Sequence, residues 1–128
     1  PENMQLNTKY NNLIDNIMSF FDDKINYALK EGLNEKNIIL DPGLGFGKSV
    51  LHNYQIIENI NKLKTKGYPI LLGISRKSFL DDNDKPSDRL YSSLAVLAIA
   101  AFNGADIFRV HDVKESFKIL NIMNRFKA

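Results

Sequence analysis

The sequence predicts an α/β fold with parallel strands, and three observations support this prediction. Amphipathic helical segments and short apolar, β-rich segments alternate along the chain, in the order helix and then strand–helix three times. The links from each helix to the next strand are short, and a helix that crosses over in this way makes neighbouring strands parallel. Glycine and ionisable residues gather after the strands, which is the ligand-binding edge of a parallel sheet.

The first predicted element is a helix over residues 10–33, where apolar side chains recur with helical spacing and Gly32 provides a stop. Residues 37–41 (NIILD) form a short β-rich run that is typical of a buried strand. A second amphipathic helix is predicted over residues 51–66, with Gly67 at its end.

The second half of the chain continues the alternation. A buried strand is predicted over residues 69–73, a polar loop over 81–88 and a very apolar helix over 89–102. A third strand over residues 106–110 and a last amphipathic helix over 113–126 complete the chain. Three strands cannot close a barrel, and a (β/α)₈ barrel contains about 250 residues. We therefore expect the 128 residues, which begin with Pro1, to be about half of a longer barrel domain.

Composition places the chain among soluble globular proteins. Apolar residues make up 44% and charged residues 25%, and 17 Lys and Arg against 15 Asp and Glu leave a net charge of +2. This small excess gives no reason to expect nucleic acid or an anionic membrane as partner. The lack of Cys excludes disulfides and thiolate metal sites and favours the reducing cytoplasm. No signal peptide is visible in these residues, and no apolar run approaches the roughly 20 residues that span a bilayer.

The segments after the three predicted strands carry the candidate site residues. Asp41 and the glycine loop that contains Phe46 follow the first strand, and the run GISRKS follows the second. Arg109 lies in the third strand and His111 directly follows it. The opposite strand ends carry ordinary turn residues. Three such segments at one edge of a sheet indicate an active site.

The glycine loop matches neither of two common phosphate-binding motifs. Gly47, Lys48 and Ser49 match the end of a P-loop, but Pro42 occupies the position of its first glycine. Proline has no N–H and a fixed φ, so the backbone nest for phosphates cannot form there as required. The spacing of the glycines also differs from the dinucleotide-binding fingerprint. A nucleotide-binding module stays as an alternative, and the glycines are interpreted as a sharp turn close to a ligand.

The ionisable residues suggest ligand chemistry. Asp41 is poorly placed to cap a helix, and its carboxylate could accept two N–H groups from the edge of a guanidine-like ring. Lys77 follows a buried strand and is expected to point inward. Arg109 and His111 are two residues apart, so they share a strand face and suit an anion. His52 is interpreted as a surface residue. No HExxH motif or His cluster predicts a metal site in this segment.

Four motifs resemble one enzyme family. DPGLGFGK, GISRKSF, RLYSSLAVLAIAAFNGA and RVHDV are similar, in order and spacing, to the second half of dihydropteroate synthase. The resemblance covers nearly the whole chain and implies helix 5 and the last three βα units of a pterin-binding (β/α)₈ barrel domain over residues 1–128. The family is a transferase of folate biosynthesis and a sulfonamide target. It condenses 6-hydroxymethyl-7,8-dihydropterin pyrophosphate with 4-aminobenzoate, giving 7,8-dihydropteroate and pyrophosphate with the help of Mg²⁺.

The resemblance also implies a role for each candidate residue. Asp41 would accept hydrogen bonds from the pterin amino group and ring N–H, and Gly73 and Arg109 would also belong to the pterin site. Lys77 would hydrogen-bond the pterin carbonyl and ring nitrogen and pack its stem on the aminobenzoate. The expected catalytic residues are Lys77, Arg109 and His111.

The remaining implied roles concern the second substrate and the leaving group. Phe46 would cover the aminobenzoate ring, and Ser78 would bind its carboxylate together with N–H groups at a helix N-terminus. Arg109 and His111 would hold the leaving pyrophosphate.

The sequence departs from the family pattern in three ways. Asp81 stands where glycine is usual and is followed by a short loop, and Ser92 replaces a usual glycine, which is expected to affect helix packing or a dimer contact. Strands one to five, with the expected Mg²⁺ ligand, are absent. The absent strands imply the missing barrel half as a partner. The resemblance also implies a second copy of the protein in a homodimer. A non-catalytic pterin-binding barrel fragment stays as a further alternative.

The missing strands also predict exposed apolar surface. Unpaired strand edges and uncovered apolar faces favour association. The side chains expected to lack partners are Ile38, Ile39, Leu71, Leu72, Ile107 and Val110.

Overall fold

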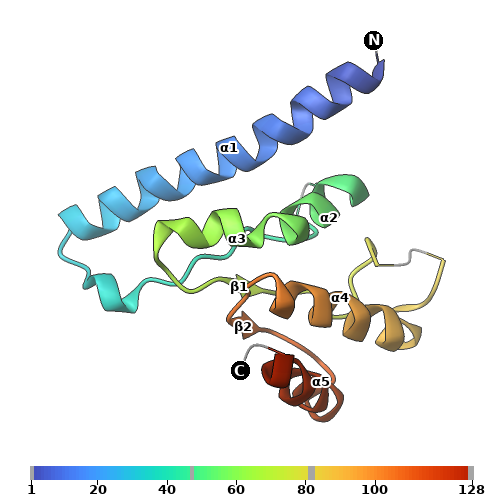
Figure 1. The fold of residues 1–128 in the computed structure, drawn as a ribbon. Coiled ribbons are helices and arrows are strands. Elements are labelled where there is room, and N and C mark those ends of the chain that lie inside the picture. The colour runs from blue at the N-terminus through green and yellow to red at the C-terminus, as the bar shows by residue number, and fades with distance from the viewer. Residues whose placement is uncertain (1, 47, 81–82, 127–128) are drawn as a thin grey trace.

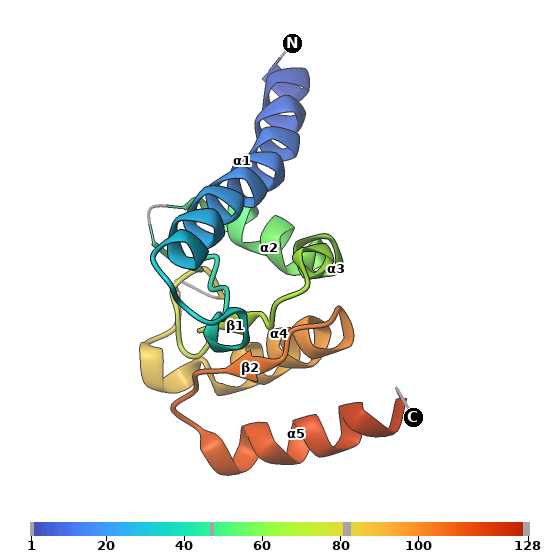
Figure 2. The same cartoon turned by 90° about the vertical axis from the view of Figure 1, so that its left-hand side faces the viewer.

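The computed structural model describes residues 2–46, 48–80 and 83–126 (Figure 1). Helix α1 lies at one end of the molecule beside α2 and α3, and α4 and α5 lie toward the other end, as Figure 1 and Figure 2 show. The named helices and strands are α1 (Glu2–Lys30), α2 (Val50–Glu58), α3 (Ile60–Leu63), β1 (Leu71–Leu72), α4 (Leu90–Phe102), β2 (Ile107–Phe108) and α5 (Val113–Phe126).

Three parallel segments lie side by side in chain order. Strand β1 pairs with β2, with Leu71 opposite Ile107, and Leu40 forms a parallel bridge with Ile70. The prediction of a parallel α/β arrangement is confirmed. The first segment is a single bridge and not the predicted strand over residues 37–41, because Asn37 belongs to a 3₁₀ turn and only Leu40 of the extended residues after it pairs with a neighbouring segment.

Two helices differ from their predicted limits. Helix α1 begins at Glu2, because residues 2–9 contain no Gly or Pro that would stop a helix. The predicted helix over residues 51–66 is divided at Asn59, whose side chain donates to the Gln55 carbonyl 2.8 Å away. A bond of this kind competes with the regular helix pattern and locally distorts it.

The predicted glycine stops at Gly32 and Gly67 are confirmed, with φ of +93° and +88°. Gly104 follows α4 with φ +112°. After α1 and α4, a backbone amide donates to a carbonyl of the last helical turn, from Leu33 to Ala28 and from Ala105 to Ala100. Glycine adopts this left-handed backbone without the steric cost that other residues carry.

Side chains alternate between the two faces of the parallel segments. Leu40, Ile70 and Leu72 are buried under the helices, whereas Ile39 and Ile107 are exposed on the opposite face. The expectation that all six apolar strand residues lack partners is therefore wrong for two of them. Ile38 and Leu72 are 8% and 0% exposed, because they point toward the helices.

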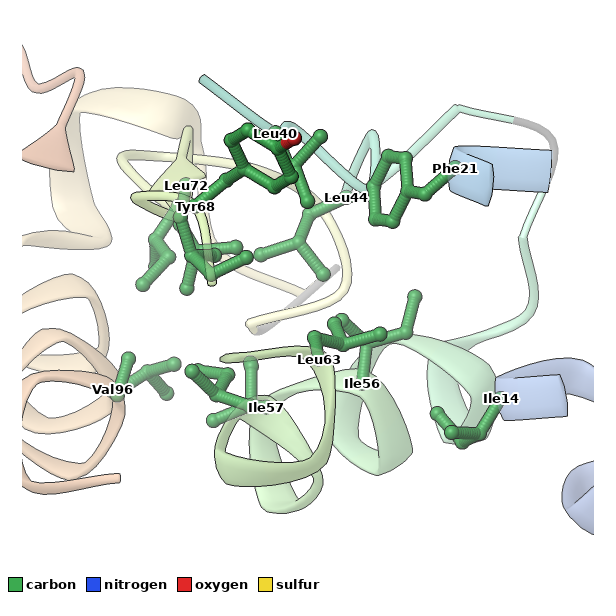
Figure 3. Packing of buried hydrophobic residues seen from close by; sticks show 14 of the residues in the cluster. Ile14, Phe21, Leu40, Leu44, Ile56, Ile57, Leu63, Tyr68, Leu72 and Val96 are labelled. Atoms are coloured by element: carbon green, nitrogen blue, oxygen red, sulfur yellow. The ribbon is translucent and has the colours of Figure 1, made fainter. Parts of the chain in front are cut away.

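The core lies between these segments and the helices (Figure 3). Figure 3 shows Leu44, Ile56 and Leu63 packed near Phe21 of α1 and Leu72 of β1. Leu44 belongs to the glycine loop and is fully buried, so this loop is anchored in the core.

Some sequence predictions lie outside the described residues. These are Pro1, Gly47 of the partial P-loop match and Asp81 of the polar loop. Among the described helices, none has the length and apolar character needed to cross a membrane.

Candidate functional site

The segments after the three parallel strands bring Asp41, Gly73 and Arg109 together. Asp41 follows the Leu40 bridge, Gly73 follows β1 and Arg109 follows β2. The Arg109 Nη1 atom lies 3.9 Å from the Asp41 Oδ2 atom, and the Arg109 backbone donates to the Leu72 carbonyl at 3.0 Å. The predicted clustering of these residues at one edge is thus observed.

The two oxygens of Asp41 have different environments. Oδ1 accepts a hydrogen bond from the Gly43 amide at 2.8 Å, which shapes the start of the glycine loop. Oδ2 points toward Arg109, and the Asp41 side chain is 38% exposed. Asp41 therefore serves as a turn residue with one carboxylate oxygen, while the other faces the guanidinium of Arg109.

Gly73 lets the Arg109 side chain lie against the backbone. A Cβ at this position would be 2.6 Å from Arg109 Nη2 and 3.2 Å from its Cζ. Real Cβ atoms do not approach other atoms this closely, so a side chain at position 73 would displace the guanidinium.

Lys77 reaches from the second loop into the glycine loop. Its Nζ donates to the Leu44 carbonyl at 2.6 Å and lies 4.9 Å from the centre of the Phe46 ring. Burial lowers the pKa of Lys77, the positive charges of Arg109 and Lys48 lower it further, and Asp41 raises it. Phe46 is 70% exposed, so most of its ring is accessible from solvent, and the Lys77 ammonium group makes a cation–π contact with it.

The glycine loop is held from within the protein. The Gly45 amide donates to Asn53 Oδ1 at 2.7 Å, and Asn53 Nδ2 donates to the Ser49 carbonyl at 2.8 Å. Asn53 is 1% exposed, so both bonds are made in the core. Sequence reasoning missed this residue because an Asn at an apolar helix face is not by itself a functional motif.

The same bonds argue against phosphate binding by this loop. The Gly43, Gly45 and Phe46 amides donate to Asp41, Asn53 and the Gly43 carbonyl, respectively. Lys48 Nζ donates to the Gly43 and Phe46 carbonyls at 3.0 and 3.3 Å. A P-loop needs these amides and its lysine for phosphate oxygens, so the geometry disfavours a nucleotide site.

His111 contacts the loop that carries Lys77. Its backbone N–H donates to Ser75 Oγ at 3.2 Å, and its Nδ1 lies 3.0 Å from the same oxygen. Ser78 is exposed and lies in a turn rather than at a helix N-terminus, since α4 begins only at Leu90. The expectation that helix amides support Ser78 is therefore wrong.

A hollow of about 590 Å³ lies between α1 and the glycine loop. Phe20, Asp41, Phe46 and Lys48 are among its lining residues. His52 also lines it and is half-buried, so its interpretation as a surface residue was incomplete. Within the described part of the chain, no group of three or more His, Cys, Asp or Glu residues could hold a metal ion.

Parallel segments followed by helices, with charged and aromatic residues gathered at one edge, are typical of proteins of the α/β-barrel class. Residues 1–111 match the family described as pterin binding enzyme, and the chain belongs to that family. It is 43% identical over 124 residues to dihydropteroate synthase of Haemophilus influenzae, which covers 95% of this chain and 45% of the relative. The chain thus spans less than half the length of this relative.

Two solved structures give the same result. A dihydropteroate synthase from Coxiella burnetii, in complex with pteroic acid, has a TM-score of 0.90 and 31% identity over 93% of this chain and 45% of that chain. The Yersinia pestis synthase with a sulfonamide drug complex has a TM-score of 0.87 and 38% identity over 90% of this chain and 43% of that chain. The prediction that the chain forms the C-terminal part of a (β/α)₈ barrel is confirmed.

Proposed function

We propose that this chain supplies the second half of the active site of a dihydropteroate synthase, a transferase of folate biosynthesis. The observation that carries the proposal is the meeting of Asp41, Gly73 and Arg109 at the carboxyl edge of three parallel segments, with Lys77 beside Phe46. The substrates are a dihydropterin pyrophosphate and 4-aminobenzoate, and sulfonamides are the expected inhibitors. The relatives named above support this choice.

The pterin site is built around Asp41. Its Oδ2 oxygen accepts N–H groups from the pterin edge, while Oδ1 stays bonded to the Gly43 amide. Lys77 Nζ, which bonds the Leu44 carbonyl, has further donors for the pterin carbonyl and ring nitrogen. Gly73 leaves room for the guanidinium of Arg109 beside the ligand.

The second substrate lies between Phe46 and the Lys77 stem, and Ser78 binds its carboxylate. Arg109 and His111 hold the pyrophosphate and neutralise the charge that develops on it. The methylene C–O bond breaks with its electron pair going to pyrophosphate. The aminobenzoate nitrogen then forms the C–N bond with its lone pair and releases one proton to water or to the departing pyrophosphate. The pterin stabilises the intermediate cation, so no covalent bond to the enzyme is needed.

Other properties are proposed on the resemblance alone. The enzyme is a cytoplasmic homodimer, and the missing barrel half is its partner in forming the site. Mg²⁺ assists it, and by the same resemblance its ligand is proposed to lie in the missing half.

The direct test is dihydropteroate formation by the complete protein that carries this chain. Both substrates are supplied, and the product is separated by chromatography. Formation of dihydropteroate supports the proposal. Pterin binding without product would favour a non-catalytic pterin-binding barrel, and ATP binding without pterin binding would favour the nucleotide module.

Replacing Arg109 by Ala in the complete protein is expected to act mainly through pyrophosphate. The variant removes the guanidinium that would hold the leaving group, so product inhibition by pyrophosphate should weaken by at least about tenfold. Lys77→Ala is the comparison, because it should weaken the pterin and aminobenzoate steps together. Equal sensitivity to pyrophosphate in Arg109→Ala and the parent would contradict the role given to Arg109.

Replacing Gly73 by Ala should mimic part of the Arg109 loss without unfolding the protein. The new Cβ would displace the Arg109 guanidinium, whose side chain is 61% exposed and free to move away. We expect pyrophosphate affinity to fall about tenfold and the thermal midpoint to stay within about 4 °C of the parent. The same substitution in Arg109→Ala should have no further effect on affinity, and an additive loss would contradict this explanation.

A further inference from the structure

An ion pair joins the loop after β1 to the segment after β2. Arg76 Nη2 lies 2.8 Å from Asp112 Oδ1, and Arg76 Nε lies 3.3 Å from Asp112 Oδ2. The two side chains are 33% and 17% exposed, so the pair is partly shielded from water. Neither residue has a role in the proposed reaction, although each is the direct chain neighbour of a residue that does.

The backbone of Arg76 is unusual. Its φ is +59°, and among the described residues it is the one non-glycine residue with a positive φ. Such a conformation is unfavourable for a side chain of this size and persists only where the surroundings fix it. Strained residues of this kind gather at functional sites, which makes Arg76 a candidate for a functional role.

Two further bonds fix the Arg76 peptide. Its amide donates to Ser93 Oγ at 3.0 Å, and its carbonyl accepts from Arg89 Nη1 at 2.7 Å. Ser93 and Arg89 are both buried, at 6% and 8% exposure. The start of α4 therefore holds the backbone of Arg76, while Asp112 holds its side chain.

We propose that Arg76 and Asp112 are positioning residues, which fix Lys77 relative to His111 and Arg109 during the transfer reaction. This inference rests on the proposed function. Lys77 follows Arg76 and His111 precedes Asp112, so each end of the ion pair lies one residue from a reacting group. The pair thus joins the part of the site that binds the two rings to the part that holds pyrophosphate.

A direct substrate contact by Arg76 fits the geometry less well. Its Nε and Nη2 donors already bind Asp112 in a two-point arrangement. The Arg76 hydrogen bond lowers the pKa of Asp112, and the same bond raises the pKa of Arg76, so both groups stay charged. Two of the five guanidinium N–H donors, which form one two-point edge, are therefore already used within the protein.

Three single variants of the complete protein test the proposal. Arg76→Gly removes the side chain and tolerates the positive φ, Arg76→Ala removes it and keeps the strain, and Asp112→Asn removes the charged acceptor. We expect each to lower kcat about 100-fold, the size of effect produced by a misplacement of about 1 Å. KM for both substrates should change by less than about threefold, because the groups that bind them are intact.

The matched control is Lys62→Gln. It breaks an ion pair with Asp15 whose N–O distance is 3.2 Å and whose side chains are 50% and 67% exposed. This variant should keep the parent kcat. The kcat of the double variant Arg76→Gly, Asp112→Asn should be no lower than that of the less active of the two single variants. The reason is that both changes remove the same contact.

Several results would overturn the proposal. Losses that add in the double variant would mean that the two residues act separately. A loss in Arg76→Ala alone would show that only backbone strain matters. A rise in KM with unchanged kcat would make Arg76 a substrate-binding residue, and kcat within twofold of the parent in all three variants would exclude any positioning role.

Hydrogen exchange separates this inference from the proposed function. In Arg76→Gly the amides of residues 109–112 should exchange faster than in the parent, although the substitution lies in the other loop. That measurement needs no substrate. Unchanged exchange would overturn the proposal, whereas a parent that forms no dihydropteroate would overturn the proposed function and leave the exchange result interpretable.

Discussion

Replacing Asp41 by Asn in the complete protein should weaken pterin binding by about 30-fold to 4,000-fold. This range corresponds to the loss of about 2–5 kcal/mol when one charged partner of a desolvated hydrogen-bonded pair is changed. An amide offers one acceptor oxygen, and its NH₂ group faces the N–H groups of the ligand instead of accepting from them. Isothermal titration calorimetry with a pterin measures the change directly.

The substitution is a sharp test because the loop should survive it. The Asn oxygen can still accept a hydrogen bond from the Gly43 amide, which in the parent donates to Asp41 Oδ1 at 2.8 Å. Asp22→Asn is a matched control, because Asp22 pairs with Lys66 outside the three loops. It should leave pterin affinity unchanged. If Asp41→Asn also bound the pterin within twofold of the parent, the assignment of Asp41 to the pterin site would be wrong.

The arrangement of this site could be predicted from sequence because parallel strands share a direction. Once the alternation of helices and strands was recognised, Asp41, Gly73 and Arg109 had to lie at one edge, and the structure places them in contact range. The glycine stop after α1 was equally predictable, since Gly32 closely follows the last apolar residues of the helical pattern.

Contacts between distant residues could not be read from periodicity. The bonds from Asn53 to the glycine loop and from Arg76 to Asp112 join positions that no local pattern links. The length of the first strand could not be predicted either. Hydrogen-bonded pairing needs a neighbouring segment as well as β propensity, and only Leu40 pairs, with Ile70. Ile38 and Leu72 were assigned to the open face because the phase of the alternation is set only by packing against the helices.

The isolated 128 residues should associate and should form no dihydropteroate. The three parallel segments leave one face uncovered, where Ile39 is 52% and Ile107 is 37% exposed. Helix α1 also leaves a hollow of about 420 Å³ beside the first segment, lined in part by Phe20 and Ile39. Parallel sheets are normally covered on both faces, so this surface is expected to bind further strands or another copy.

Light scattering of the purified chain would measure its mass, and an assay with and without the first half of the barrel would measure its activity. Ile39→Lys should reduce association if the open face drives it, because a charge there opposes burial. Tyr91→Lys is the control, since Tyr91 is 84% exposed and belongs to α4 rather than to the three parallel segments. Adding the first half of the barrel should give a complex of one defined mass in light scattering, and product formation should appear at the same time. A monomeric chain that turns over both substrates alone would contradict the proposed division of the site between two barrel halves.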